Sequence, residues 1–204
     1  MKNDYKQCPI TISLIGLIVI VYIYTTLKYG IEMNVLQGIE AGGFNPFLVL
    51  QGKQFYRLIT ANFIHFGLMH IFCNAYSLYN LGMIMERILG QKKYLLVIVV
   101  SMLSTTLIPL LLYVFNGTGI NSIMGGISGV IFGLIGSLFA LALLYKDVYM
   151  YLFKQVASSV ILMLFLSVIL PSISLTGHIG GMIGGFLITY FIEKKNQSKR
   201  KLIN

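Results

Sequence analysis

The sequence predicts an all-α polytopic membrane protein, and three observations support this class. First, 57% of the 204 residues are hydrophobic and only 10% are charged, whereas a soluble domain carries about 25% charged residues. Second, apolar stretches of spanning length recur along the chain. Third, the Lys and Arg residues gather between and after these stretches, as they do in the loops of membrane proteins.

Six stretches are long enough to cross a bilayer as helices, and we expect one membrane domain over residues 10–193. They cover residues 10–28, 66–86, 94–115, 128–145, 151–170 and 177–193. The first follows a short segment, residues 1–9, and lacks an Ala-x-Ala cleavage pattern, so we interpret it as a retained helix. One long loop, 29–65, follows it, and a basic tail, 194–204, follows the last span.

The charge distribution predicts the orientation. With the N-terminus inside, the inner segments hold 12 of the 15 basic residues, and the outer segments hold Lys28, Lys53 and Arg57. Lys and Arg are enriched on the cytoplasmic side, so we expect both termini there. The net charge of +9 then requires no nucleic acid, and the tail is expected to contact anionic lipid. The Lys-, Asn- and Ile-rich composition favours a bacterial inner or plasma membrane.

The even-numbered spans carry polar residues of a catalytic type at the same, outer end. These residues are His70 and Asn74 in the second span, Ser128 in the fourth and His178 in the sixth. Polar side chains inside a bilayer are costly and usually mark function. A serine and a histidine at one membrane depth can act as a nucleophile and its base. We therefore expect one site, which water reaches through a cavity.

Ser128 lies at the expected start of the fourth span, in the sequence Gly-Gly-Ile-Ser-Gly. The flanking Gly126 and Gly129 let the backbone turn sharply, and the free N–H groups of a helix start favour negative charge. This pattern fits a nucleophile beside an oxyanion. The alternative is a surface of small residues that packs against another helix, and the short motif alone does not decide between them.

His178 lies among glycines, because Gly177, Gly181 and Gly184 place small residues on and around its helix face. We expect the sixth helix to pack closely on the fourth, which would bring His178 to Ser128. The alternative is a glycine zipper with an incidental histidine. The outer ends of the even-numbered spans carry no Asp or Glu, so a Ser-His dyad is a simpler prediction than a full triad.

His70 and Asn74 are four residues apart and share one helix face. Both can donate hydrogen bonds, which fits an oxyanion hole for acyl transfer; the alternative is a polar patch that joins helices. Metal or haem ligation with His65 and Cys73 is a further alternative. His65 and His70, however, lie about 140° apart around a helix, and Cys8 and Cys73 form no disulfide or metal motif. We expect free thiols, no metal and no cofactor.

In these residues the chain resembles the rhomboid family of intramembrane serine proteases. The segment from Tyr56 to Asn74 resembles that family's second-helix region, and the segment from Met85 to Gly90 resembles the end of the same helix. The sequence Gly-Ile-Ser-Gly ending at Gly129 and the sequence His-Ile-Gly-Gly beginning at His178 match its GxSG and histidine-glycine motifs. The resemblance covers about residues 50–190, and the order of the motifs makes it specific.

The resemblance implies a six-helix rhomboid bundle and a serine endopeptidase that cuts transmembrane or membrane-adjacent segments of membrane proteins near the outer face. Ser128 would be the nucleophile and His178 the general base and acid. The oxyanion would be stabilised by His70, Asn74 and the Ser128 N–H. The residues that would support this site are Gly126, Gly129, Phe132 and Gly181. Substrates would be transmembrane proteins, and we expect the chain to function as a monomer.

Three positions depart from the family's usual pattern. Tyr56 stands where tryptophan is usual, Gly177 where alanine is usual, and Phe132 where bacterial members often have tyrosine. Gly177 is expected to loosen the packing, and Phe132 is expected to stack on His178 without the hydroxyl. Arg57, beside Tyr56, is expected to anchor the long loop at the headgroup boundary.

Two other classes of function compete with a protease. A catalytically inactive relative with this fold could bind client helices as a chaperone, but such relatives have usually lost the serine and histidine that Ser128 and His178 supply. A small transporter or channel would need charged or paired polar residues through the membrane, and the predicted spans lack them. The sequence therefore favours the protease.

Overall fold

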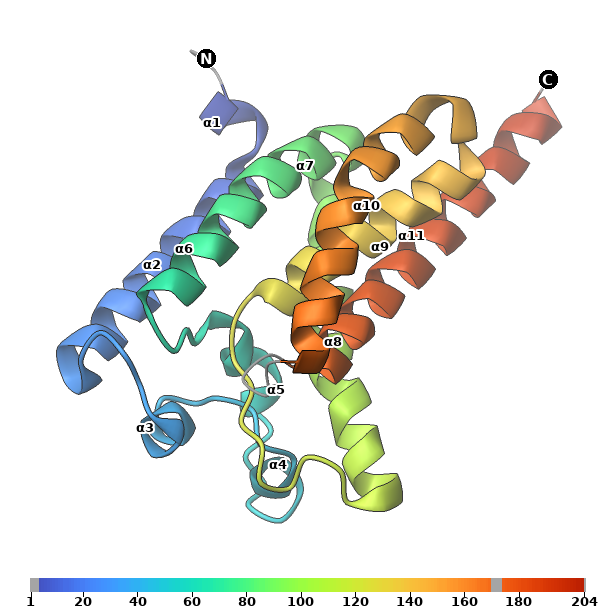
Figure 1. Ribbon diagram of the computed structural model, residues 1–204. Coiled ribbons are helices and arrows are strands. Elements are labelled where there is room, and N and C mark those ends of the chain that lie inside the picture. Colours follow the sequence, from blue (N-terminus) through green and yellow to red (C-terminus); the bar gives the residue numbers. More distant parts are fainter. Residues whose placement is uncertain (1–3, 170–173, 204) are drawn as a thin grey trace.

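The computed structural model describes residues 4–169 and 174–203, which are mostly helical and contain no β-strand (Figure 1). The longer helical segments are α2 (Pro9–Tyr29), α6 (Leu68–Ser77) with the π-helical turn η2 (Leu78–Gly82) and α7 (Met83–Leu89), α8 (Gln91–Asn116), α9 (Ser128–Leu144), α10 (Lys146–Ile169) and α11 (Leu175–Ile203). The shorter ones are α1 (Asp4–Gln7), α3 (Val35–Glu40), α4 (Pro46–Leu50), α5 (Arg57–Thr60) and the 3₁₀ turn η1 (Ala61–Phe63).

Four of the described helices are long and apolar enough to cross a membrane, namely α2, α8, α10 and α11. A bent pair, Arg57–Phe63 with Leu68–Leu89, would be a fifth span, with a bend of 92° at its break. The apolar helix α9 has only 17 residues, and most of them are buried. Within the described residues the structure therefore supports four or five spans, and the sixth stays a prediction.

Several boundaries differ from the predicted spans. α10 begins at Lys146, before the predicted start at 151, and α11 continues to Ile203, past the predicted end at 193. Lys, Arg and Gln are good helix formers, so the segment predicted as a tail extends the helix. The predicted loop 29–65 contains three short α-helices and the 3₁₀ turn η1. Residues 1–3, 170 and 204 of the predicted segments lie outside the described residues.

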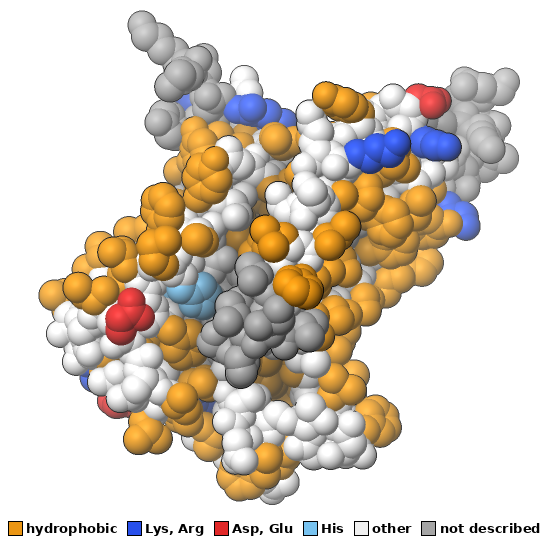
Figure 2. All heavy atoms as spheres, viewed as in Figure 1, with side chains coloured by type: hydrophobic (Ala, Val, Ile, Leu, Met, Phe, Trp, Pro, Cys, Tyr) orange, Lys and Arg blue, Asp and Glu red, His pale blue; other side chains and the backbone are white. Residues whose placement is uncertain are grey.

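The two termini lie at one end of the bundle, and α3 and α4 lie at the opposite end (Figure 1). α9 is central, because it packs against α11, α10 and α8. Lys and Arg side chains gather mainly at the end with the termini, and the face between the two ends is largely hydrophobic (Figure 2). This distribution is the one expected of helices that meet lipid along their length.

Glycines set the distance between α9 and α11. A β-carbon on Gly181 would overlap the carbonyl oxygen of Gly129, and one on Gly185 would overlap that of Gly133. The two backbones therefore touch, which larger side chains would prevent. The predicted close packing of the last helix on the helix of Ser128 is confirmed.

Glu86 joins α7 to the start of α2. Its carboxylate accepts hydrogen bonds from the backbone N–H of Ile10 (3.0 Å) and from the N–H (2.8 Å) and hydroxyl (2.7 Å) of Thr11. A carboxylate at a helix start pairs with N–H groups that have no partner in the helix and with the positive end of the helix dipole. Glu86 thus has a structural role, because it holds the start of α2 against α7.

Candidate active site

A cavity of about 710 Å³ lies where α6, α9 and α11 meet. It is lined by residues from the loop after α2, from α6, from the segment before α9 and from α11. His70, Asn74, Ser128 and His178 are all among them. The structure therefore brings the four predicted site residues together around one space.

Ser128 and His178 are in hydrogen-bonding contact. The Nε2 atom of His178 lies 2.9 Å from the Oγ atom of Ser128, the first residue of α9. Phe132, one helical turn after Ser128, stacks on the His178 ring with centroids 4.2 Å apart and planes 14° apart. A hydroxyl and an imidazole at this distance can transfer a proton.

His70 and Asn74 lie against Gly126, two residues before Ser128. A β-carbon on Gly126 would lie 2.6 Å from His70 Nε2 and 3.3 Å from Asn74 Nδ2, and the Gly126 φ is +111°. Both observations require glycine here. Asn74 Nδ2 is buried and has no hydrogen-bond partner among the described residues. The backbone N–H of Phe66 donates to His70 Nδ1 (3.4 Å), which leaves the ring proton on Nε2.

The supporting glycines lie where the helices are closest. A β-carbon on Gly129 would overlap the side chain of Thr105, as one on Gly181 would overlap Gly129 itself. A β-carbon on Gly177 would lie 3.0 Å from Ser174 Oγ. That oxygen ends a short side chain that can rotate, so the expectation that Gly177 loosens the packing stays a prediction.

Two residues have surroundings that the sequence did not predict. His65 is fully buried, and its ring bonds backbone groups on both sides instead of a metal. Arg57 is only 4% exposed and donates hydrogen bonds to the carbonyls of Ile39 (2.7 Å) and Gly43 (2.6 Å). It therefore anchors the long loop, as predicted, but through buried contacts, and its place at the headgroup boundary stays a prediction. A buried guanidinium needs several acceptors, and the loop carbonyls supply them.

The described residues form no group of metal ligands at this site. Across residues 4–169 and 174–203, no three His, Cys, Asp or Glu side chains gather closely enough to hold a metal ion. Cys8 and Cys73 are both free thiols, and Cys73 lines the cavity. Glu32 is the one carboxylate among the described lining residues, and it lies against Gly67 at the start of α6.

Comparison with known proteins assigns the family. Residues 52–195 match the model of the Rhomboid domain, which is more than half of the chain. The chain is 28% identical over 143 residues to Rhomboid protease GluP of Bacillus subtilis, covering 68% of this chain and 26% of that protein. It is also 28% identical over 156 residues to RHOMBOID-like protein 4 of Arabidopsis thaliana, covering 74% and 37% respectively.

The putative rhomboid protease YdcA of Bacillus subtilis is closer in length. It is 28% identical over 166 residues, covering 77% of this chain and 76% of that protein. The chain thus spans about a quarter to two fifths of the first two relatives and most of the third. Its apolar helices and this match identify a multi-pass membrane protein, and the chain belongs to the rhomboid family.

Proposed function

We propose that the chain is an intramembrane serine endopeptidase that hydrolyses peptide bonds of transmembrane substrates near the outer face. Ser128 is the nucleophile, and His178 is the general base and acid. The observation that carries this proposal is the 2.9 Å contact between Ser128 Oγ and His178 Nε2 inside a cavity. The protease names of the relatives and the intact Gly-Ile-Ser-Gly sequence add support.

In the first half of the reaction, Ser128 Oγ attacks the carbonyl carbon of the substrate, and its proton passes to His178 Nε2. The negative charge that forms on the carbonyl oxygen meets His70 Nε2–H, Asn74 Nδ2–H and the Ser128 N–H. His178 then gives the proton to the leaving nitrogen as the C–N bond breaks. An ester between Ser128 and the acyl part of the substrate remains.

In the second half, a water molecule attacks this ester while His178 accepts its proton. The same donors stabilise the second oxyanion, and the proton returns to Ser128 Oγ as the acid leaves. Phe132 covers one face of the His178 ring, which limits the positions that the imidazole can take during both proton transfers.

The substrate must present an extended segment to this site. In a helix, each carbonyl accepts a hydrogen bond from the residue four positions later, so nucleophilic attack is hindered. Glycine or proline near the cut lowers the cost of unwinding, because both are poor helix formers. We therefore propose substrates with small residues before the cut and helix-breaking residues after it.

The test is cleavage of a model transmembrane substrate in liposomes. Ser128→Ala should abolish cleavage, whereas Ser137→Ala should retain it. Ser137 lies on the same helix but is buried and bonds Thr189 at 2.7 Å, away from the cavity. Cleavage by the Ser128→Ala protein would rule out this mechanism. Absence of cleavage by the unmodified protein, across several such substrates, would favour the helix-binding chaperone.

We also infer the topology from the charge distribution. In this arrangement residues 10–193 form six spans with α9 as the fourth, and both termini face the cytoplasm of a bacterium. Helix α9 would be about 26 Å long, and its burial inside the bundle means that it need not match the lipid thickness. The test is to introduce single cysteines, Lys53→Cys and Lys195→Cys, and to treat intact cells with an impermeant thiol reagent. The cysteine at position 53 should be labelled and the one at position 195 should not. If the cysteine that replaces Lys195 were labelled in intact cells, the orientation would be the opposite of the one proposed.

Two partner proposals follow from this topology. The basic extension of α11, residues 194–203, would contact anionic lipids of the inner leaflet. The bundle would act as a monomer, because one chain supplies every residue of the proposed dyad and oxyanion site. Sedimentation of the active protein in detergent as a dimer, with loss of activity on dilution, would contradict the second proposal.

A further inference from the structure

His65 lies at the break between η1 and α6, where the bent pair turns by 92°. Its ring is fully buried, and the two ring nitrogens contact different parts of the chain. Nδ1 lies 3.2 Å from the carbonyl oxygen of Phe63, and Nε2 accepts the backbone N–H of Ile127 at 3.5 Å. A carbonyl can only accept and an N–H can only donate, so the ring proton sits on Nδ1.

The loop that His65 contacts is able to change its shape. Gly125 and Gly126 precede Ile127, and glycine tolerates both signs of φ. The peptide unit between Gly126 and Ile127 is planar, so the direction of the Ile127 N–H also sets that of the Gly126 carbonyl. If this plane turned over, the carbonyl oxygen would face the lone pair on His65 Nε2. His65 thus selects one of the two orientations of the peptide unit between Gly126 and Ile127.

The neighbouring peptide units are held by other bonds. The Gly126 N–H donates to the carbonyl of Ala61 at 2.9 Å, and the Val130 N–H donates to the carbonyl of Ile127 at 2.9 Å. The Ile127 N–H is the group between these two bonds, and Ile127 is fully buried. A buried N–H without a partner is costly, and His65 is the partner that the structure supplies.

We propose that His65 is a positioning residue for the oxyanion site, an inference that rests on the proposed protease function. By holding the peptide unit between Gly126 and Ile127, it fixes the backbone that leads into Ser128 and keeps Gly126 facing His70 and Asn74. The His65 and His70 rings also meet edge to face, with centroids 5.0 Å apart and planes at 65°. One ring therefore supports the loop and one of the oxyanion donors.

Three variants separate this role from simple filling of space. In His65→Gln, the amide reaches the position of Nε2 and accepts the Ile127 N–H. In His65→Asn, the shorter side chain reaches only the Nδ1 position, and His65→Leu fills the site without polar atoms. The measurements are kcat and KM for a transmembrane substrate in liposomes, and the rate at which a fluorophosphonate probe labels Ser128.

The expected result is an ordered loss of rate. Because a displacement of about 1 Å can cost 10²-fold in rate, kcat and labelling should fall between about 10- and 100-fold in the Asn and Leu variants and less than about threefold in the Gln variant. KM should change little, because His65 does not line the cavity. Leu89→Ala is the matched control, since Leu89 is buried in α7 at the other end of the bundle; it should lower Tm and leave kcat unchanged.

Two kinetic outcomes would overturn the proposal. One is an unchanged kcat in His65→Leu, and the other is an equal loss in all three variants that simply follows their loss of Tm. A readout independent of activity is the ¹⁵N NMR spectrum of the imidazole, which should show the proton on Nδ1; a proton on Nε2 would also overturn it. If the probe did not label the protein but the proton was on Nδ1, the result would contradict the proposed protease function and still support the His65 contact.

Discussion

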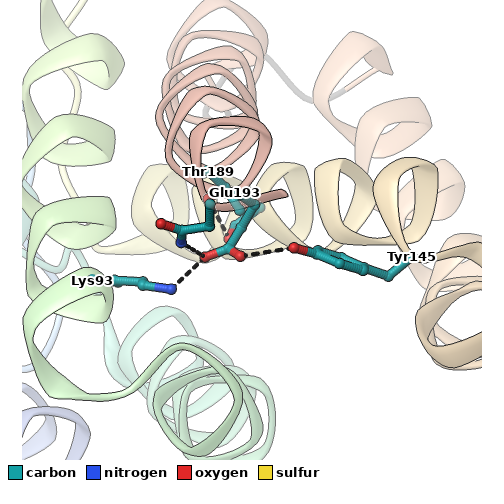
Figure 3. Close-up of polar contacts among 6 residues, drawn as sticks. Lys93, Tyr145, Thr189 and Glu193 are labelled. Atoms are coloured by element: carbon teal, nitrogen blue, oxygen red, sulfur yellow. Dashed lines mark hydrogen bonds and ion pairs between the residues drawn. The ribbon is translucent and has the colours of Figure 1, made fainter. Parts of the chain in front are cut away.

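The region where α9 and α11 pack together has polar side chains at both of its ends, and the two ends are built differently. At one end Ser128 and His178 face a cavity, and the nearby Asn74 Nδ2 has no partner among the described residues. At the other end the carboxylate of Glu193 has its hydrogen-bonding capacity largely used. The donors to Glu193 are Lys93, Tyr145 and Asn196 (Figure 3).

The difference distinguishes contacts that hold the helices together from side chains that are left available to a substrate. A buried donor without a partner costs about 1–3 kcal/mol, and the Asn74 amide lines the cavity, where a substrate can reach it. At the Glu193 end the side chains of α8, the α9–α10 corner and α11 satisfy one another, which fixes α11 in place. Between the two ends the glycine contacts and the Ser137–Thr189 hydrogen bond keep the helices in register. We call the end at Glu193 the closed end and the end at Ser128 and His178 the open end. The contacts at the closed end fix α11 and so help to set the positions of the side chains at the open end.

The largest effect is expected from removal of the unpaired donor, the side-chain amide of Asn74. Asn74→Ala should lower kcat by about 10²–10³-fold, as removal of one oxyanion donor does in other enzymes, with little change in Tm because no hydrogen bond is lost. Kinetics in liposomes and a thermal melt check both parts. Asn80→Ala is the control, since Asn80 is exposed and its side chain donates, within the described part of the chain, to the nearby Tyr76 carbonyl alone. A fully active Asn74→Ala protein would exclude Asn74 from the oxyanion site.

The glycine contacts are expected to have the next largest effect. In Gly181→Ala the new methyl group would overlap the Gly129 carbonyl and move His178 away from Ser128. We expect kcat to fall by about 100-fold, because reacting groups tolerate little displacement, and Tm to fall as well. In the control, Gly16→Ala on α2, the methyl group meets no atom of another described segment within 4 Å. A Gly181→Ala protein that matches this control would mean that the helices can separate without loss of function.

The sequence predicted the open end better than the closed one. Ser128, His178, His70 and Asn74 are polar residues inside apolar spans, and such signals are visible along a single chain. His65 and Glu193 were not assigned these contacts, because their partners are distant. The Ile127 N–H lies 62 residues from His65, and Lys93 lies 100 residues from Glu193. The break before α6 was also missed, since the predicted span began at residue 66, inside the break, and the helical turns before the break were assigned to the loop.

The smallest effect on rate is expected at the closed end. Glu193→Gln removes a nearly buried carboxylate that Lys93 and Tyr145 contact. Because Lys93 is partly exposed, the loss should be only about 1 kcal/mol of unfolding free energy. We expect kcat to change by less than about threefold, since the glycine contacts still hold the two helices together. Thermal melts and kinetics in the same detergent measure both quantities.

Glu40→Gln is the matched control for this variant, because Glu40 also pairs with a lysine, Lys28, at 2.7 Å, but both side chains are well exposed. Solvent and salt screen such a pair, so its removal should leave Tm unchanged. If Glu193→Gln lowers Tm and Glu40→Gln does not, burial is what makes the first ion pair a structural contact. If Glu193→Gln instead lowers kcat as much as Gly181→Ala, the two ends are coupled, and the Glu193 contacts help to set the distance between Ser128 and His178.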